Sequence, residues 1–100
     1  MAERAADAAA FLKALSHEGR LMILCHLSAG EKSVTALEDL LDVRQAAVSQ
    51  HLARLRSEGL VTTRRDGKVI YYTIKDPKVR AMIALVHEMF CAGAEAASRS

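Results

Sequence analysis

Hydrophobic residues recur at helical spacing in five stretches of the chain, and β-rich runs occur in two others. The helical stretches begin at, or directly after, Ala2, Ser16, Ser33, Arg44 and Pro77. The two β-rich runs, residues 60–63 and 69–74, follow the fourth helical stretch and flank Asp66-Gly67, which is a favoured two-residue hairpin turn. The pattern therefore predicts a mainly α protein with a β-hairpin, in the order α-α-α-α-β-β-α.

Capping residues mark the ends of several expected helices. Ser16 is suited to cap the second helix, because Glu18 then lies in the first turn, where a carboxylate favours the helix dipole. Gly30 suits the C-terminal end of that helix, and Ser33 caps the third. Asp76 followed by Pro77 is a strong start signal for the last helix.

The fourth helix has one apolar face and one polar face. Val48, Leu52 and Leu55 are spaced i, i+4 and i+7, so they share a face that we expect in the core. The polar side offers small, amide and guanidinium groups that can approach base edges, from Gln45, Ala46, Ser49, Gln50, Ala53 and Arg54. An ordinary solvated face is the alternative for this helix taken alone. A helix-turn-helix followed by a basic hairpin is nevertheless the layout of a winged-helix DNA-binding module.

Positive charge gathers on this same part of the chain. Residues 44–68 hold six Lys/Arg and two acidic residues, a local charge of +4, while the whole chain has a formal net charge of +2. Arg64, Arg65 and Lys68 are expected at the hairpin tip, where they would contact the phosphate backbone, and Arg44 is a further candidate phosphate contact. This basic pole on a mildly acidic body is typical of a nucleic-acid-binding protein.

The rest of the composition narrows the class of protein. One hundred residues predict a single domain over residues 1–100. We expect a cytoplasmic protein that needs no cofactor, because the sequence has no signal peptide, transmembrane run or phosphate loop. The sequence has no Cys-His-acid spacing of the kind found in enzymes. Its two cysteines form neither a CxxC nor a zinc-finger pattern. The last helix carries more apolar residues than a monomer needs, so the first and last helices are expected to form a homodimer.

Two segments resemble the ArsR/SmtB family of dimeric bacterial repressors. They are ALSHEGRLMIL in the second helix and AAVSQHLARLRSEGLVTTRRDGKVIYY from the fourth helix through the hairpin. The resemblance covers nearly the whole chain and implies a winged helix-turn-helix that binds double-stranded operator DNA. The family's metal sites do not carry over. The third helix lacks the Cys-x-Cys pair, and the last helix has His87, Glu88 and Glu95 but no second histidine.

Cys25 and Cys91 have the placement of the sulfide-responsive BigR-type branch of this family. That resemblance implies that reactive sulfur species, persulfides or polysulfides, join the two cysteines through a short sulfur bridge. The repressor then leaves its operator, and sulfide-oxidation genes are expressed. The alternatives are a metal-responsive repressor of the same family and two cysteines that only pack. His51 is expected to be a packing or backbone contact rather than a base reader. The distance between the cysteines, and whether a bridge lies within or between subunits, stay open.

Overall fold

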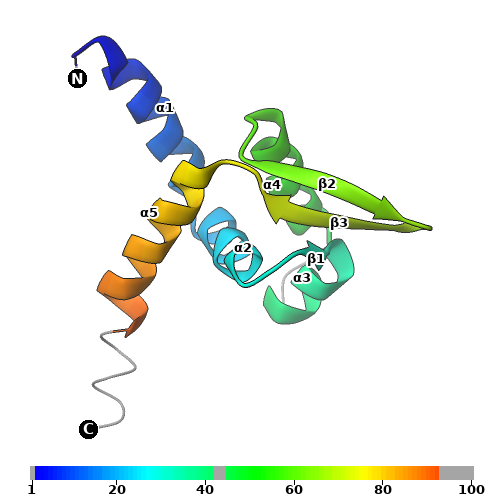
Figure 1. The fold of residues 1–100 in the computed structure, drawn as a ribbon. Coiled ribbons are helices and arrows are strands. Elements are labelled where there is room, and N and C mark those ends of the chain that lie inside the picture. Colours follow the sequence, from blue (N-terminus) through cyan, green and yellow to red (C-terminus); the bar gives the residue numbers. More distant parts are fainter. Residues whose placement is uncertain (1, 42–44, 93–100) are drawn as a thin grey trace, which may run out of the picture.

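The structure, a computed structural model, describes residues 2–41 and 45–92 and confirms the predicted winged helix-turn-helix (Figure 1). Among residues 45–92, the side chains of 45, 46, 91 and 92 lie outside the described set. The helices and strands are α1 (Ala5–Leu15), α2 (Glu18–Ser28), β1 (Lys32–Ser33), α3 (Val34–Leu41), α4 (Gln45–Ser57), β2 (Val61–Asp66), β3 (Val69–Ile74) and α5 (Pro77–His87). A 3-10 turn, η1 (Ala2–Arg4), precedes α1, and a π-helical turn, η2 (Glu88–Ala92), continues α5.

Two of the three predicted N-terminal caps are confirmed and one is wrong. Asp76 accepts a hydrogen bond from the Lys78 amide at 2.9 Å, and Ser33 accepts one from the Ala36 amide at 3.1 Å. Ser16 does not cap α2 but ends α1. His17 takes its place, because its Nδ1 atom accepts the Gly19 amide at 3.0 Å. An imidazole nitrogen thus satisfies an exposed helix amide that a hydroxyl was expected to satisfy. At its other end α2 is capped by Ala29, one residue before the predicted Gly30.

The sheet has three antiparallel strands in the order β1-β3-β2, of which β2 and β3 form the wing. Strand β2 extends to Asp66, which pairs with Val69, so the two loop residues are Gly67 and Lys68. The predicted turn at Asp66-Gly67 is therefore wrong by one residue. Gly67 has a φ of 64°, a conformation that glycine adopts without steric cost. Strand β1, which is only two residues long, was not predicted from the sequence.

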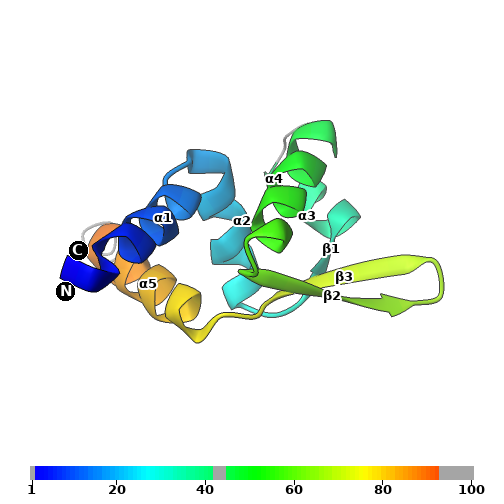
Figure 2. The ribbon, with the colours of Figure 1, turned by 90° about the horizontal axis from the view of Figure 1, so that it is seen from above.

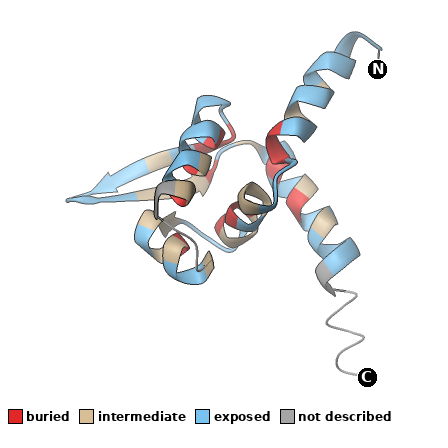
Figure 3. Cartoon of the chain, turned by 180° about the vertical axis from the view of Figure 1, so that it is seen from behind, coloured by how far each residue is buried: buried red, intermediate tan, exposed pale blue. Residues whose placement is uncertain are grey.

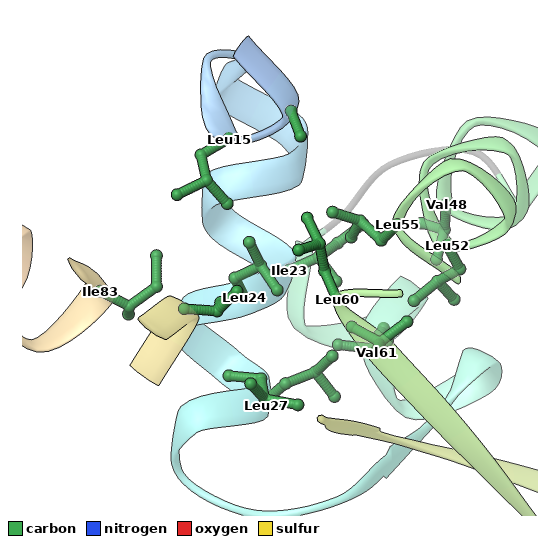
Figure 4. Packing of buried hydrophobic residues seen from close by; sticks show 14 residues of the cluster. Leu15, Ile23, Leu24, Leu27, Val48, Leu52, Leu55, Leu60, Val61 and Ile83 are labelled. Carbon is green, nitrogen blue, oxygen red and sulfur yellow. The ribbon is translucent and has the colours of Figure 1, made fainter. Parts of the chain in front are cut away.

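The core lies where α2, α4 and the sheet meet (Figure 4). Val48, Leu52 and Leu55 are each 0% exposed, which confirms the predicted inner face of α4. They pack in one cluster with side chains from the other elements, including Leu15, Ile23, Leu24, Leu27, Leu60, Val61 and Ile83. Burying each Leu or Ile side chain contributes about 1.5–3 kcal/mol relative to leaving it exposed. The orientation of α4 is therefore set by its own apolar face.

Helices α1 and α5 project from the end of the molecule opposite the wing (Figures 1 and 2). Both are largely exposed along their outer turns, in contrast to α2 (Figure 3). Their exposed side chains include large apolar ones, at Leu12, Leu85, Met89 and Phe90. The fold therefore separates two surfaces, the wing with α4 at one end and an apolar pair of helices at the other.

The start of α2 packs against α4 through two imidazole rings. The ring centroids of His17 and His51 are 4.6 Å apart. A Cβ atom added to Gly19 would lie 2.7 Å from Nε2 of His51, so a larger residue at this position would force the His51 ring to shift. The two histidines, with Glu18 and neighbouring apolar residues, line a cavity of about 400 Å³. His51 is half-buried and acts as a packing residue, as the sequence predicted.

This contact is expected to make the stability of the protein fall in mild acid. Burial lowers the pKa of His51, and the nearby charges of His17 and Arg20 lower it further. The unfolded chain, with an ordinary histidine pKa of about 6.5, then binds more protons than the folded one below that pH. Stability from neutral His51 is thus present above about pH 6.5 and is lost as pH falls through the lowered pKa.

We expect the urea midpoint of unfolding to decrease as the pH is lowered from 7 to 5. The decrease should be smaller in His51→Gln than in the unmodified protein. His26→Gln is the matched control, since His26 does not line the cavity between α2 and α4. Protein concentration must be held constant, because association also changes apparent stability. An equally steep fall in His51→Gln would mean that another group controls the acid sensitivity.

Candidate functional site

The outer face of α4 is polar and open. Ser49, Gln50, Ala53 and Arg54 are exposed, on the side away from the buried Val48. Arg54 is also paired with Glu58, one helical turn on, with Nε 3.5 Å from a carboxylate oxygen. An exposed pair of this kind is weak, so it leaves the guanidinium able to exchange partners. Arg44 and the side chains of Gln45 and Ala46, which belong to the same predicted surface, lie outside the described residues.

The three predicted wing cations do not behave alike. Arg65 and Lys68 are exposed near the turn, as expected. Arg64 lies further from the tip, at the fourth position of β2, and forms an ion pair with Glu31. The hydrogen bond from Arg64 holds the pKa of Glu31 below its usual value, and the same contact raises the pKa of Arg64. Glu31 is the residue that sequence analysis missed, because nothing local marks a partner 33 positions away.

Cys25 lies in the middle of α2 and is half-buried against the core cluster. Its backbone carbonyl accepts a hydrogen bond of 2.6 Å from the hydroxyl of Ser28, near the end of the helix. Helix α2 packs against α5, and the chain that continues α5 through η2 contains Cys91. The side chain of Cys91 lies outside the described residues. The structure thus brings together the helices that bear or lead to the two cysteines.

A cleft of about 400 Å³ opens between the end of α2 and α5. Ser28 lines it from α2, and Arg80, Ile83, Ala84 and His87 line it from α5. Arg80 is oriented by a long hydrogen bond of 3.4 Å to the Ile74 carbonyl. The cleft therefore lies one helical turn from Cys25 along α2 and brings basic groups to that side of the helix.

A metal site in the part of the chain that the structure describes would need several ligand side chains close together. There, no group of three or more His, Cys, Asp or Glu side chains is placed to hold a metal ion. The described helices also include none that is long and apolar enough to cross a membrane.

Comparison with known proteins connects this arrangement to one family. Residues 17–63 match the family described as bacterial regulatory protein, arsR family. The chain is 45% identical to the transcriptional activator HlyU of Vibrio cholerae, over 91% of this chain and 84% of HlyU. It is 44% identical to the biofilm growth-associated repressor of Agrobacterium fabrum, over 95% of this chain and 81% of that protein.

Solved structures agree with these matches. Reduced HlyU from Vibrio cholerae superposes with a TM-score of 0.87, covering 91% of this chain and 96% of that one. The repressor BigR from Xylella fastidiosa is 41% identical and superposes with a TM-score of 0.86, covering 91% of this chain and 93% of that one. These relatives are transcriptional regulators, which confirms the prediction that the chain is not an enzyme. The chain belongs to the ArsR family of winged helix-turn-helix, DNA-binding transcriptional regulators.

Proposed function

We propose that this protein is a homodimeric repressor that binds operator DNA when its cysteines are reduced. Linking Cys25 to Cys91 through a chain of sulfur atoms releases it. The observation that carries the proposal is the packing of α2, which bears Cys25, against α5, whose continuation bears Cys91. Resemblance to the repressor BigR supports the repressor function, and resemblance to a reduced form of HlyU supports a dependence on redox state.

The DNA-binding surface would combine α4 with the wing. Gln50 and Ser49 are exposed on α4, where Gln can pair with the edge of adenine. Arg65 and Lys68 are exposed near the wing tip, where they would contact phosphates without reading sequence. Arg44, Gln45, Ala46 and Arg54 complete the proposed surface.

The apolar end of the molecule would form the dimer. Leu85, Met89 and Phe90 are 50%, 62% and 69% exposed on α5 and η2, and Leu12 is 50% exposed on α1. Side chains of this size in one region favour association with a second copy. A two-fold dimer would present two α4 helices to successive major grooves, so its operator would be palindromic.

The chemistry of the switch needs no oxidant besides the sulfur donor. Each thiolate attacks the outer sulfur of an organic persulfide, takes that sulfur and releases the organic thiol. One cysteine persulfide then attacks the other, which forms a bond between the sulfur chains and expels hydrogen sulfide. The donor is reduced, the two thiols are oxidised, and the proton leaves with the sulfide. The exposed Arg80 and the neighbouring His87 would attract anionic sulfur species to this side of α2.

A bridge that contains added sulfur atoms would also make the switch selective for sulfur donors over oxidants that form only a direct disulfide. A direct disulfide requires Cα atoms roughly 4.4–6.8 Å apart, whereas a longer sulfur chain relaxes that limit. Bridging would then constrain α5 relative to α2 and shift the spacing of the two α4 helices. Allosteric couplings of about 1–3 kcal/mol correspond to a roughly 5–150-fold loss of affinity.

Two substitutions should separate sequence reading from phosphate contact. The probe is a duplex selected from random-sequence DNA by its affinity for the reduced protein, compared with an unselected duplex. Gln50→Ala should reduce discrimination between the two by about 1–3 kcal/mol. Arg65→Ala should weaken binding to both and make the slope of log K against log salt shallower by about 1.8, because a dimer loses two phosphate contacts of about 0.9 each.

Lys78→Ala is the charge-matched control for Arg65→Ala, because Lys78 is exposed at the start of α5. Its salt slope should match that of the unmodified protein. Equal losses on both duplexes for Gln50→Ala would show that this side chain only positions the helix. An unchanged slope for Arg65→Ala would remove it from the phosphate contacts.

The switch is tested by replacing each cysteine. Cys25→Ser and Cys91→Ser should bind the selected duplex like the reduced protein, but glutathione persulfide should no longer weaken that binding. In the unmodified protein the same treatment should lower affinity by about 5–150-fold, and dithiothreitol should restore it. Release of either variant by the persulfide would contradict the proposal. Release by stoichiometric zinc, in place of the persulfide, would favour a metal-responsive repressor.

A further inference from the structure

An ion pair joins the segment after α2 to the wing. Glu31 follows Gly30, whose φ of 148° turns the chain out of α2, and directly precedes β1. Its two carboxylate oxygens accept hydrogen bonds from Arg64, at 3.1 Å from Nε and at 2.5 Å from a terminal nitrogen. A bidentate pair of this kind fixes the plane of the guanidinium as well as its distance. The contact exists only in the folded protein, because the residues are 33 positions apart.

The same guanidinium also covers the middle strand. Tyr71 is paired with Arg64 across β2 and β3, and with Ser33 across β1 and β3. The guanidinium carbon of Arg64 lies 4.8 Å from the centroid of the Tyr71 ring, which is a cation–π distance. Because the strand order is β1-β3-β2, Arg64 reaches from the outer strand over the middle one to the residue before β1. The pair therefore ties β2 across the full width of the sheet.

The neighbouring cation is in a different situation. Successive side chains of a strand point to opposite faces, so Arg65 does not share the face of Arg64. Within the described ranges, neither Arg65 nor Lys68 takes part in an ion pair. Both are therefore available to phosphates, whereas the charge of Arg64 is already matched by a carboxylate that its hydrogen bond keeps ionised.

We propose that Glu31 is a positioning residue for DNA binding, which holds Arg64 and so presents the wing at a fixed angle to α4. Arg64 is then a structural anchor and not a phosphate ligand. This inference rests on the proposed contact of the wing with DNA. It predicts an effect opposite in sign to simple electrostatics. Removing the negative charge of Glu31 weakens DNA binding, although DNA is itself an anion.

The test compares Glu31→Gln, Arg64→Gln and the double variant with Glu58→Gln. Glu58→Gln is a matched control, because it removes the same charge from an exposed pair within α4. Each reduced protein is measured against the selected duplex over a range of salt concentrations. Amide hydrogen exchange of β2 and β3 is measured without DNA, so that the state of the wing is read independently of binding.

Glu31→Gln and Arg64→Gln should each weaken binding roughly two- to fivefold, as expected for loss of an exposed ion pair. The double variant should be no weaker than either single one, because both remove the same contact. Wing amides should exchange faster in all three variants and not in Glu58→Gln. The salt slope of Arg64→Gln should stay unchanged, whereas that of Arg65→Ala becomes shallower. The charge exchange Glu31→Arg with Arg64→Glu should recover part of the affinity.

Tighter binding by Glu31→Gln, or a shallower salt slope for Arg64→Gln, would overturn the inference and make Arg64 a phosphate ligand that Glu31 restrains. Unchanged affinity together with unchanged wing exchange would overturn it as well. In all of these cases the proposed function survives if Arg65→Ala still flattens the salt slope. If neither Arg65→Ala nor Gln50→Ala alters binding to DNA, the proposed DNA surface itself fails.

Discussion

Helix α4 buries one of its faces against α2, and this packing sets how the helix is oriented in the protein. Val48, Leu52 and Leu55 are removed from solvent by side chains that include Ile23 and Leu27. Because a helix has two sides, burying this stripe fixes which residues face outward, and these are Ser49, Gln50 and Arg54. The outward polar face of α4, which we propose as the recognition surface, is therefore a consequence of hydrophobic packing. Among the described polar side chains of α4, His51 adds a contact to this packing, with the ring of His17.

Helix α2 has a second set of contacts that gives the fold its regulatory potential. It packs against α4, α3, β3 and α5, so the part that bears Cys25 is connected both to the recognition helix and to the apolar end of the molecule. A covalent link from α2 to the continuation of α5 would act on a helix that cannot move without disturbing α4. At the N-terminal end of α2, His17 packs against His51. At its C-terminal end, a turn leads to Glu31. These contacts link the ends of α2 to α4 and to the wing.

Sequence alone was sufficient for whatever depends on local pattern. The inner face of α4, the Asp76-Pro77 start of α5 and the wing follow from spacing and capping chemistry, and the structure confirms them. The wrong predictions, the cap of α2 and the position of the hairpin turn, each required a choice between neighbouring residues that suit the role about equally well. His17 displaced Ser16 as a cap because its ring is also held against His51. The hairpin turn moved by one residue because the positive φ falls at Gly67 when Asp66 stays in the ladder.

What sequence could not supply is every contact between residues far apart in the chain. The pairing of Arg64 with Glu31 changes the meaning of a basic wing, because one of three apparently equivalent cations is already engaged. Strand β1 was missed for the same reason, since its two residues become a strand only by pairing with β3. The proposed role of the cysteines likewise came from family resemblance. The structure adds the packing of α2 against α5. A bond between the two cysteines would therefore join α2 to the continuation of a helix that it already contacts.

The most direct test of the account follows modification and DNA affinity in the same samples. The reduced protein is titrated with glutathione persulfide, and each sample is divided between mass spectrometry under non-reducing conditions and binding to the selected duplex. We expect a linked peptide pair containing Cys25, Cys91 and added sulfur, with affinity falling in proportion to its abundance. Persulfidation of both cysteines without a link, or a complete link that leaves affinity unchanged, would contradict it.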